Sequence, residues 1–388
     1  MAQEFDVEAL GVGLRVRVAG LTRRDVRRLR AQWRRVSGRG ATAATISVAV
    51  GDPVGGADVR GSDFDEVSVA LRQLINLRAI ERRRDLLMFH AAGLADPATG
   101  DVIALIGASG AGKTTAASSL GTALGYVSDE TVAVDAVGRV HPFPKPLAVK
   151  QRHGLNKRIA GPDALGLLEA HTPLRLTRLA LLDRRDEQVA PTITTVGLEE
   201  VLAAIIEQTS YFASLPNALQ RLEALATASG GVHVIRYHHA ADLVEPVSDL
   251  LRRPGPYLQL PGIVERSGSV ADADTIPRGW FGRAGFDDWI ELGGDVLVLL
   301  GGRVSRLSPL GSVLWAALEE PQPLEALVAT AEAALGPAPA GSARVVVQTM
   351  LDELVAAGLV VAGAVGQHPE ESLGDIAPRR QGEPLPRA

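Results

Sequence analysis

IALIGASGAGKTT, residues 103–115, gives the strongest indication of the fold. Its apolar beginning predicts a buried strand, and the Ala- and Ser-rich run that follows predicts a helix. Between the two, residues 107–114 match the pattern G-x-x-x-x-G-K-[ST], whose glycines allow backbone N–H groups to turn toward a phosphate. Since the loop also opens a helix, whose N-terminus carries partial positive charge, the context predicts a phosphate-binding loop. The alternative is a glycine-rich turn that binds nothing.

The pattern assigns roles to the residues of this loop. Lys113 can reach the β- and γ-phosphates of a nucleotide, and Thr114 can ligate Mg²⁺. The sequence therefore predicts ATP and Mg²⁺ as cofactors. The motif itself recognises the phosphates and does not distinguish ATP from a nucleotide with another base. The loop residues expected to bind the nucleotide are Gly107, Ser109, Gly110, Ala111, Gly112, Lys113, Thr114 and Thr115.

Two acids follow the predicted helix in GYVSDETVAVD, residues 125–135. Asp129 lies fifteen residues beyond Thr114, and Glu130 comes directly after it. A carboxylate beside a metal-bound γ-phosphate can accept the proton of an attacking hydroxyl, so these acids are candidates for that role. The alternative is a pair of turn acids between a helix and a strand.

Other nucleotide-binding classes fit the sequence poorly. Two more acids, Asp135 and Asp183, end apolar strands, and each is either a magnesium-water ligand or an ordinary strand-end acid. The base-reading NKxD pattern of GTPases lacks its acid after residues 156–157, and the nearest fragment to an ABC signature, residues 229–231, lacks its Gln.

Four motifs in order resemble the catalytic core of HPr kinase/phosphorylase-type serine kinases, and of the peptide-biosynthesis members in particular. They are FHAAGLAD, IALIGASGAGKTT, LGYVSDETVAVD and GRVHPFPKPLAVK, and the resemblance covers residues 86–150 and fades toward residue 251. It implies an α/β P-loop kinase core of the HPr kinase and PEP carboxykinase type. It also implies that Asp129 is the general base, that His90 lies near the reacting groups, and that Glu130 stands where the family has a second Asp.

The resemblance thus gives a complete set of site residues. The implied catalytic residues are Asp129, His90, Lys113 and Glu130, and the implied magnesium ligands are Thr114 and Glu130. Two lysines of HPFPKPLAVK, Lys145 and Lys150, are further candidates for phosphate binding, with solvated surface lysines as the alternative. Only 4 of the 40 basic residues are lysine, and all four fall between residues 113 and 157.

The C-terminal part reads as a separate small module. DVLVLL and RVSRL, residues 295–300 and 303–307, flank Gly301-Gly302 as a hairpin, and three helices follow from Ser308 to residue 357. This order resembles the PqqD-like peptide-recognition domains, winged-helix α+β modules that take a leader peptide as an added strand beside the hairpin. DNA-binding winged helices share the pattern, but residues 286–361 carry ten acids and three arginines, which disfavours a phosphate backbone. A packing or dimerisation domain is the other alternative.

The order of elements predicts five segments. An N-terminal α/β extension, residues 1–85, contains strands at 14–18 and 44–50 and helices at 21–36 and 64–84. The other segments are the kinase core at 86–251, a Pro- and Gly-rich linker at 252–284, the PqqD-like domain at 285–362 and a disordered tail at 363–388. The arginine-rich run in the helix at 21–36 is a solvated helix face or, less simply, a nucleic-acid patch.

Composition limits the functional classes. The net charge is −5 and there is no cysteine, which excludes disulfides and thiolate metal sites and indicates no general attraction to nucleic acid or to anionic membranes. No signal peptide or long apolar run is apparent, so we expect a cytoplasmic protein.

The sequence predicts a kinase that transfers the γ-phosphoryl group of ATP to a hydroxyl, expected to be a serine, of a ribosomal precursor peptide or small protein. The leader of that substrate would be held by the PqqD-like domain. Two alternatives stay open, a nucleotide-gated peptide-binding adaptor without transferase activity and a small-metabolite kinase. A homo-oligomer is compatible with the sequence.

Overall fold

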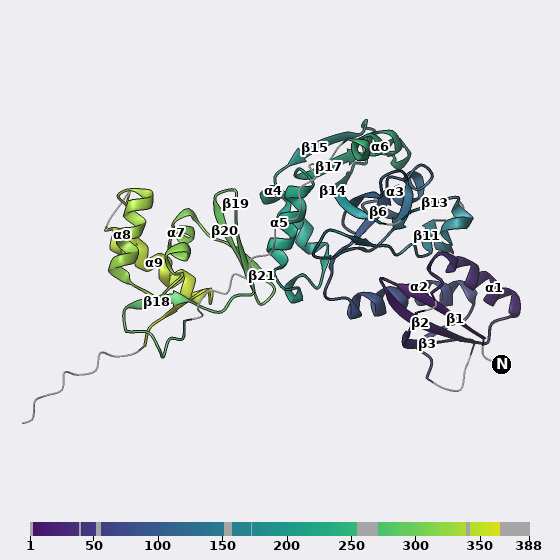
Figure 1. The fold of residues 1–388 in the computed structure, drawn as a ribbon, viewed down its shortest axis with the longest axis horizontal. Coiled ribbons are helices and arrows are strands. Elements are labelled where there is room, and N and C mark those ends of the chain that lie inside the picture. The colour runs from purple at the N-terminus through teal and green to yellow at the C-terminus, as the bar shows by residue number, and fades with distance from the viewer. Residues whose placement is uncertain are drawn as a thin grey trace, which may run out of the picture. The chain divides into compact units, whose positions relative to one another are not determined.

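The computed structural model describes residues 3–38, 40–51, 56–150, 157–171, 173–253, 271–338 and 342–364; the side chains of Lys150 and Lys157 lie outside this description. The described residues divide into two compact units. The first holds residues 3–253 together with Phe286–Arg306, and the second holds residues 271–285 and 307–364. Figure 1 shows both and labels many of their helices and strands.

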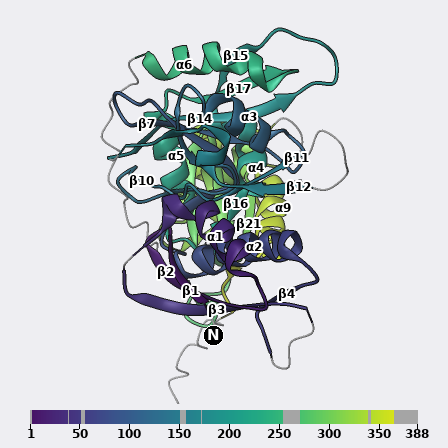
Figure 2. The same cartoon turned by 90° about the vertical axis from the view of Figure 1, so that its right-hand side faces the viewer.

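The N-terminal residues form a four-stranded sheet in the order β1-β2-β3-β4, covered on one face by helices α1 and α2 (Figure 1). Figure 2 shows the two helices between this sheet and strand β12 of the core. Burial alternates along β2, as a sheet with one covered face requires. The elements are β1 (Gln3–Ala9), β2 (Val12–Ala19), α1 (Arg23–Gln32), η1 (Arg34–Val36), β3 (Thr42–Val50), β4 (Val59–Gly61) and α2 (Phe64–Arg82).

The predicted strands at 14–18 and 44–50 and the predicted helix at 64–84 are confirmed within a few residues. The predicted helix at 21–36 ends early, because the chain tightens at Trp33 into a 3₁₀ turn. Strand β1 was missing from the prediction. It pairs with β2 through a two-residue turn in which Leu10 and Gly11 both have positive φ.

A seven-stranded mixed sheet forms the centre of the first unit, in the order β13-β8-β6-β7-β14-β17-β15. Strand β7 lies in its middle, antiparallel to β6 and parallel to β14. The strands are β6 (Ala91–Ala95), β7 (Asp101–Ile106), β8 (Gly125–Ser128), β13 (Leu168–Glu169), β14 (Arg175–Arg184), β15 (Thr192–Val196) and β17 (Val232–Tyr237).

Helices cover both faces of this sheet. Val102, Ala104 and Ile106 point into a core cluster shared with α4 (Leu198–Glu207) and α5 (Ala218–Ala228). The alternate residues, Ile103 and Leu105, point into a second cluster shared with α3 (Lys113–Leu120) and α6 (Val244–Arg252). Burial on both faces explains why β7 reads as a continuous apolar run. The predicted α/β layering is therefore observed.

The apolar run at residues 86–95 forms two strands. It breaks at His90, because Leu87–Phe89 pairs with β9 and β16 in a small sheet while β6 joins the large one. The small sheet has the order β10-β9-β5-β16. The remaining elements of this region are β5 (Leu87–Phe89), β9 (Val132–Val134), β10 (Val140–His141), β11 (Leu147–Lys150), β12 (Lys157–Ala160), η2 (Pro162–Leu165), β16 (Thr209–Ser210), η3 (Phe212–Ser214) and η4 (Ala240–Leu243).

The predicted hairpin at residues 295–307 is confirmed and has a third strand. Its sheet has the order β19-β20-β21, with β19 at Asp288–Leu292, β20 at Asp295–Leu300 and β21 at Arg303–Arg306. Ile290, Leu297 and Leu299 pack into the same core cluster as α4 and α5. The expected domain at 285–362 is therefore divided, since this sheet belongs to the first unit and the helices after it to the second.

The second unit contains the three predicted helices, α7 (Pro309–Ala317), α8 (Leu324–Leu335) and α9 (Ala343–Ala356). Ser308 caps α7 by accepting from the backbone N–H of Gly311, as predicted. Three short strands pair in the order β22-β18-β23 and occupy Gln322–Pro323, Trp280–Arg283 and Val360–Ala362.

The expected linker at 252–284 is therefore wrong at its C-terminal end. Trp280–Arg283 is a strand, and the buried Arg283 donates to the backbone oxygen of Trp315. The strands that pair with it lie about forty and about eighty residues later in the sequence, so no local pattern predicts this strand. Most of the expected linker and of the expected tail, residues 254–270 and 365–388, lies outside the described residues. No helix among the described residues is both long and apolar enough to span a membrane.

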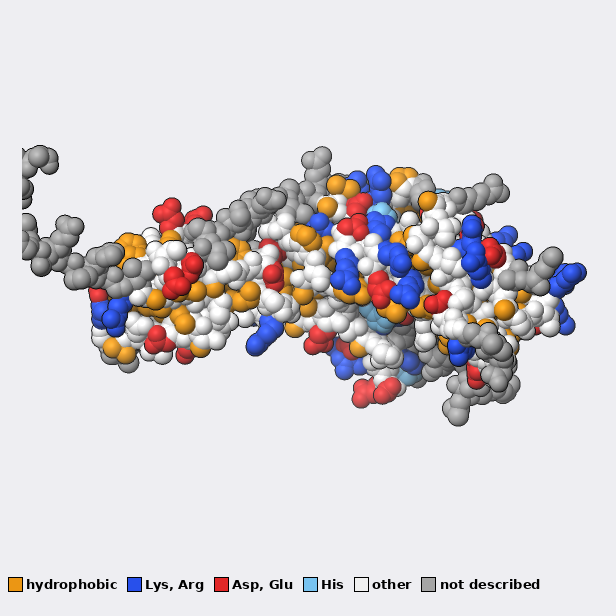
Figure 3. Space-filling view, turned by 90° about the horizontal axis from the view of Figure 1, so that it is seen from below, with side chains coloured by type: hydrophobic (Ala, Val, Ile, Leu, Met, Phe, Trp, Pro, Cys, Tyr) orange, Lys and Arg blue, Asp and Glu red, His pale blue; other side chains and the backbone are white. Residues whose placement is uncertain are grey.

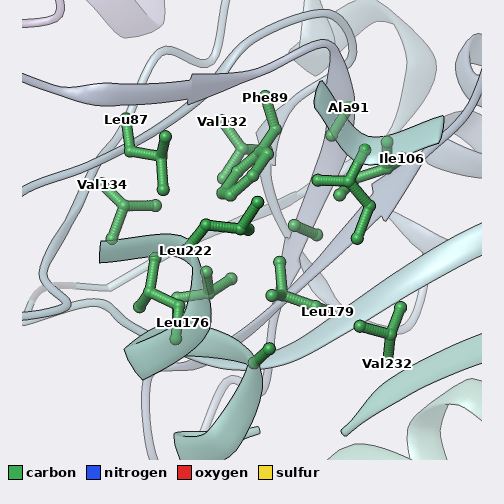
Figure 4. Close-up of a cluster of buried hydrophobic side chains, with 14 of the residues drawn as sticks. Leu87, Phe89, Ala91, Ile106, Val132, Val134, Leu176, Leu179, Leu222 and Val232 are labelled. Atoms are coloured by element: carbon green, nitrogen blue, oxygen red, sulfur yellow. The ribbon is translucent and has the colours of Figure 1, made fainter. Parts of the chain in front are cut away.

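Phe89 fills the core between the two sheets and should carry much of its stability. It is completely buried, and Figure 4 shows it among Val132 and Leu222. We expect Phe89→Ala to lower the free energy of unfolding by about 3–5 kcal/mol, because it leaves a large cavity. Urea denaturation measures this, with the exposed Val137→Ala as a control expected within about 0.5 kcal/mol of wild type. Equal losses in the two variants would contradict the packing.

Candidate functional site

The glycine-rich loop connects β7 to α3, as its sequence predicts. Gly110 and Gly112 have φ angles of +91° and +88°, which L side chains rarely adopt. A Cβ on Gly112 would also lie 2.6 Å from the hydroxyl oxygen of Tyr237. That hydroxyl donates to the backbone oxygen of Ala111 at 2.7 Å and so holds the loop against β17.

Lys113 is folded back over this loop. Its ammonium donates to the backbone oxygens of Gly107 and, at 3.0 Å, of Ala108. Burial lowers the pKa of Lys113, and the carboxylates of Glu130 and Asp129 oppose that effect. The loop therefore presents a cation that is shielded from bulk water.

Asp129 is brought to the start of α3 by strand β8. Its Oδ2 accepts from Thr114 Oγ1 at 3.2 Å, and its side chain is almost completely buried. Its Oδ1 lies 3.4 Å from the hydroxyl of Tyr126 and 3.5 Å from Nζ of Lys145. The carboxylate is thus oriented by three neighbours, as a group with one defined task needs to be.

Glu130 is held by two cations. Its Oε2 accepts from Nζ of Lys145 and, at 3.0 Å, from Nη1 of Arg72. Burial alone would raise the pKa of Glu130, but Lys145 and Arg72 outweigh it and lower that pKa to about 2. A carboxylate with so low a pKa is a weak base, which disfavours Glu130 as a proton acceptor.

His90 occupies the break between β5 and β6 and lines the same cavity. Burial, and to a smaller extent the charge of Lys113, lowers the pKa of His90. The imidazole is therefore neutral at pH 7 and can donate one hydrogen bond and accept another.

These residues surround a cavity of about 540 Å³. Its wall includes Ser109, Gly110, Gly112, Lys113, Thr114, Thr115, His90, Asp129 and Glu130 from the predicted set. Gly107 and Ala111 belong to the loop but do not line the cavity. Arg72 and Arg184 line it and were missed, because neither lies within or beside a recognisable motif.

Of the two candidate lysines, Lys145 is completely buried and contacts both carboxylates, so it lies beneath the cavity rather than in its wall. Its contact with a phosphate stays a prediction. Lys150 lies at the end of β11, and its side chain is outside the described residues, as are residues 151–156.

The two other strand-end acids have surface roles. Asp135 accepts from the backbone N–H groups of Val137 and Arg139 in a turn. Asp183 forms ion pairs with Arg185 and Arg236. Neither lines the cavity, so the strand-end interpretation holds for both.

The donor chemistry at the start of α3 fits magnesium. The hydroxyl of Thr114 and the carboxylates of Asp129 and Glu130 are hard oxygen donors, which Mg²⁺ prefers. The described residues contain no group of three or more His, Cys, Asp or Glu that could enclose a metal ion. Magnesium that is bound largely through substrate phosphates and water needs no such group.

Some arginines of α1 and both arginines of the following turn, η1, make local contacts. Arg34 and Arg35 pair with Asp163 of the core, and Arg28 lies over the ring of Phe64. Figure 3 shows basic and acidic side chains interspersed on the face it presents. The choice between a solvated helix face and a nucleic-acid patch stays a prediction.

A second, smaller cavity of about 220 Å³ lies beside the hairpin sheet, within the first unit. Its wall is mainly apolar and comes from α4 and from all three hairpin strands: Glu199, Leu202, Ala203, Ile206, Leu292, Leu297, Val304 and Arg306. In the described part of the chain, the outer edge of β21 pairs with no strand. An open strand edge beside an apolar groove is a feature that extended peptides can bind.

Residues 295–360 match the family model described as Coenzyme PQQ synthesis protein D (PqqD). No curated protein matches the chain. The chain is therefore a mixed α/β protein with a PqqD domain at its C-terminus, and this domain indicates a peptide-binding role of the kind found in ribosomal-peptide biosynthesis. The matched residues run from strand β20 through the three helices of the second unit.

The pairing of Glu130 predicts a specific pH dependence of stability. Its pKa is about 2 when folded, against 4.5 for the free group, so its stabilising effect is complete above pH 4.5 and disappears as the pH falls toward 2. From pH 5 to pH 3 we expect wild type to lose about 2 kcal/mol more free energy of unfolding than Glu130→Gln.

Urea denaturation at the two pH values measures this difference. Glu169→Gln, which removes an exposed carboxylate on β13, is the matched control and should keep the wild-type pH dependence. If Glu130→Gln also kept it, the ion pairs with Lys145 and Arg72 would not exist in solution.

Proposed function

We propose that the chain is an ATP-dependent kinase of the HPr kinase-like type, which phosphorylates a hydroxyl, expected to be a serine, of a precursor peptide or small protein. The observation that carries the proposal is the contact of Thr114 with Asp129 at the end of the glycine-rich loop. This contact supports the proposal, because Asp129 lies beside the residue pair that the sequence pattern assigns to phosphate and magnesium.

The chain's own residues suit each part of such a transfer. Asp129 accepts the proton of the acceptor hydroxyl as its oxygen bonds to the γ-phosphorus. The bond from that phosphorus to the β–γ bridging oxygen breaks, and the electron pair leaves with ADP. Backbone N–H groups of the loop and Lys113 bind the phosphate oxygens, where charge develops. Bound magnesium, held by Thr114 and Glu130, would neutralise further charge on those oxygens.

The other residues of the site position and protect these groups. Tyr126 and Lys145 keep Asp129 in one orientation, and Lys145 does so from a fully buried position. His90 is neutral and can hydrogen-bond the acceptor or a phosphate oxygen. Burial of Lys113 and Asp129 excludes bulk water, which strengthens their interactions with the reacting groups.

The PqqD domain supplies the support for a peptide acceptor. A leader segment bound as an added strand beside β21 would tether the acceptor serine to the protein. Tethering raises the local concentration of the hydroxyl to about the millimolar range for a flexible connection, without contacts at the reacting atoms themselves. The apolar groove between α4 and β21 would take side chains of that strand.

Two other functions remain candidates. A nucleotide-gated adaptor would use the same two sites without transfer, and Glu130 in the place of the family's Asp favours it. A small-metabolite kinase would use the cavity at the loop and not the groove. Transfer to a peptide, and its dependence on the groove, separates all three.

Asp129→Asn should abolish transfer and preserve binding. The amide keeps the shape but cannot accept the proton, so we expect turnover to fall by about 10²–10⁴-fold while the affinity for ATP changes little. Labelled ATP and a candidate precursor peptide measure turnover, and a fluorescent nucleotide measures affinity. Asp135→Asn, at a surface turn, is the control and should behave like wild type. Undiminished transfer by Asp129→Asn would contradict its role as base.

Ala203→Asp should weaken leader binding. Ala203 is exposed on α4 and lines the apolar groove, so a carboxylate there would be desolvated by a bound peptide. We expect at least about tenfold weaker binding of a leader peptide, measured by calorimetry, and an unchanged affinity for ATP. Ala204→Asp places the same charge on the next exposed residue, outside the groove, and should bind the leader normally. Equal binding by both variants would show that the leader binds elsewhere.

A further inference from the structure

One arginine of the N-terminal layer, the sheet β1-β2-β3-β4 with helices α1 and α2, lines the cavity at the glycine-rich loop. Arg72 lies in the middle of α2, a helix of the N-terminal layer, and its side chain is 12% exposed. It lines the cavity together with Lys113 and Thr114. The site is therefore not made by the core alone.

A polar stripe on α2, buried at Ser68 and partly buried at Arg72 and Asn76, fixes the position of this arginine. Ser68, Arg72 and Asn76 follow one another at a spacing of four and so share one face of the helix. Ser68 donates to Gln32, which in turn donates to the backbone oxygen of Ile159 in the core. One turn beyond Arg72, the side chain of Asn76 accepts from Thr131, next to Glu130 in sequence.

The guanidinium of Arg72 is only partly used by the protein. Nη1 donates to Oε2 of Glu130 at 3.0 Å. Nε is buried and has no partner among the described residues, and Nη2 makes no hydrogen bond to any of them. An arginine that served only as a counter-ion would gain most from a bidentate contact with both carboxylate oxygens. Arg72 instead contacts one oxygen of Glu130 through Nη1, and its other guanidinium N–H groups make no hydrogen bond to the described residues.

We propose that Arg72 is a catalytic residue that contacts the γ-phosphoryl group during transfer, with Glu130 as its positioning residue. The proposal rests on the proposed function. As the hydroxyl oxygen bonds to phosphorus, Asp129 takes the proton and the β–γ bridging oxygen leaves with the electron pair of the broken bond. Negative charge spreads over the equatorial oxygens of the phosphoryl group, and a planar, permanently charged guanidinium matches them.

The charges already present explain why a further cation is useful. Lys113 is hydrogen-bonded to the loop backbone, and the sequence pattern assigns it to the phosphates of the nucleotide. Lys145 is buried beneath the two carboxylates. Two arginines line the cavity, Arg184 of β14 and Arg72, and Arg72 is the one that is hydrogen-bonded to Glu130, next to the candidate base. The assignment also gives the N-terminal layer a function, since without it the core lacks this charge.

The competing explanation is that Arg72 only joins α2 to the core through Glu130. That role predicts a loss of stability on substitution, with no difference between nucleotides that have and lack the γ-phosphate. The proposed role predicts the opposite pattern.

The test uses the full chain with Arg72→Lys and Arg72→Ala. Arg78→Lys and Arg78→Ala on the same helix are the controls, because Arg78 pairs with Glu81 and does not line the cavity. The measurements are the Kd values for ADP and for a non-hydrolysable ATP analogue, the Kd for ADP with aluminium fluoride, which resembles the transferring phosphoryl group, the turnover and the Tm.

We expect Arg72→Lys to bind ADP within about twofold of wild type and the ATP analogue at least about tenfold more weakly. Binding of ADP with aluminium fluoride and turnover should both fall by at least about 100-fold. Arg72→Ala should show the same order of effects, and both Arg78 variants should resemble wild type. Equal changes for ADP and the ATP analogue, or a lower Tm with normal turnover in Arg72→Lys, would overturn the proposal.

The outcomes also separate this proposal from the proposed function. If wild type binds the ATP analogue through Arg72 but transfers nothing, the kinase assignment and the catalytic role of Arg72 both fail, and only its contact with the γ-phosphate stands. If wild type transfers phosphate and Arg72→Lys does so equally well, only the assignment of Arg72 fails. If wild type binds neither nucleotide, both are wrong.

Discussion

The buried ammonium of Lys145 is the interaction on which the site depends. It contacts Asp129 and Glu130 at once and is completely shielded from water. Two adjacent carboxylates at the end of a loop would otherwise repel each other and any phosphate. With Lys145 below them, Asp129 can lie against Thr114 and Glu130 can face Arg72. A buried charge network of this kind contributes little net stability, but it fixes the orientation of each member.

The architecture brings this network together from distant parts of the chain. The glycine-rich loop follows strand β7, and the two carboxylates follow strand β8. His90 lies at the break between β5 and β6. The N-terminal layer adds Arg72 through a helix that is bound to the core by its polar stripe. The hairpin sheet packs on α4 and α5, so the groove at β21 belongs to the same compact unit as the loop.

Local patterns made much of this structure predictable, and long-range pairings made the rest unpredictable. The loop and its helix could be named because a motif of fixed spacing carries them, the two carboxylates because they follow that helix closely in sequence, and His90 because the family resemblance implies it. Arg72 could not, because its importance comes from the packing of α2 against a turn almost sixty residues later. The polar stripe of Ser68, Arg72 and Asn76 was the one available signal. Strand β18 was read as linker for the same reason, since it pairs only with residues far along the chain.

The proposed activity is transfer of a phosphoryl group to a peptide that is bound by the same chain. Its most direct test is mass spectrometry of a candidate precursor peptide after incubation with the wild-type protein, ATP and Mg²⁺, with its leader segment present or removed. We expect a mass gain of one phosphoryl group on a serine, fast with the leader and slow without it. No phosphorylated peptide, under conditions where both ATP and the leader are shown to bind, would contradict it.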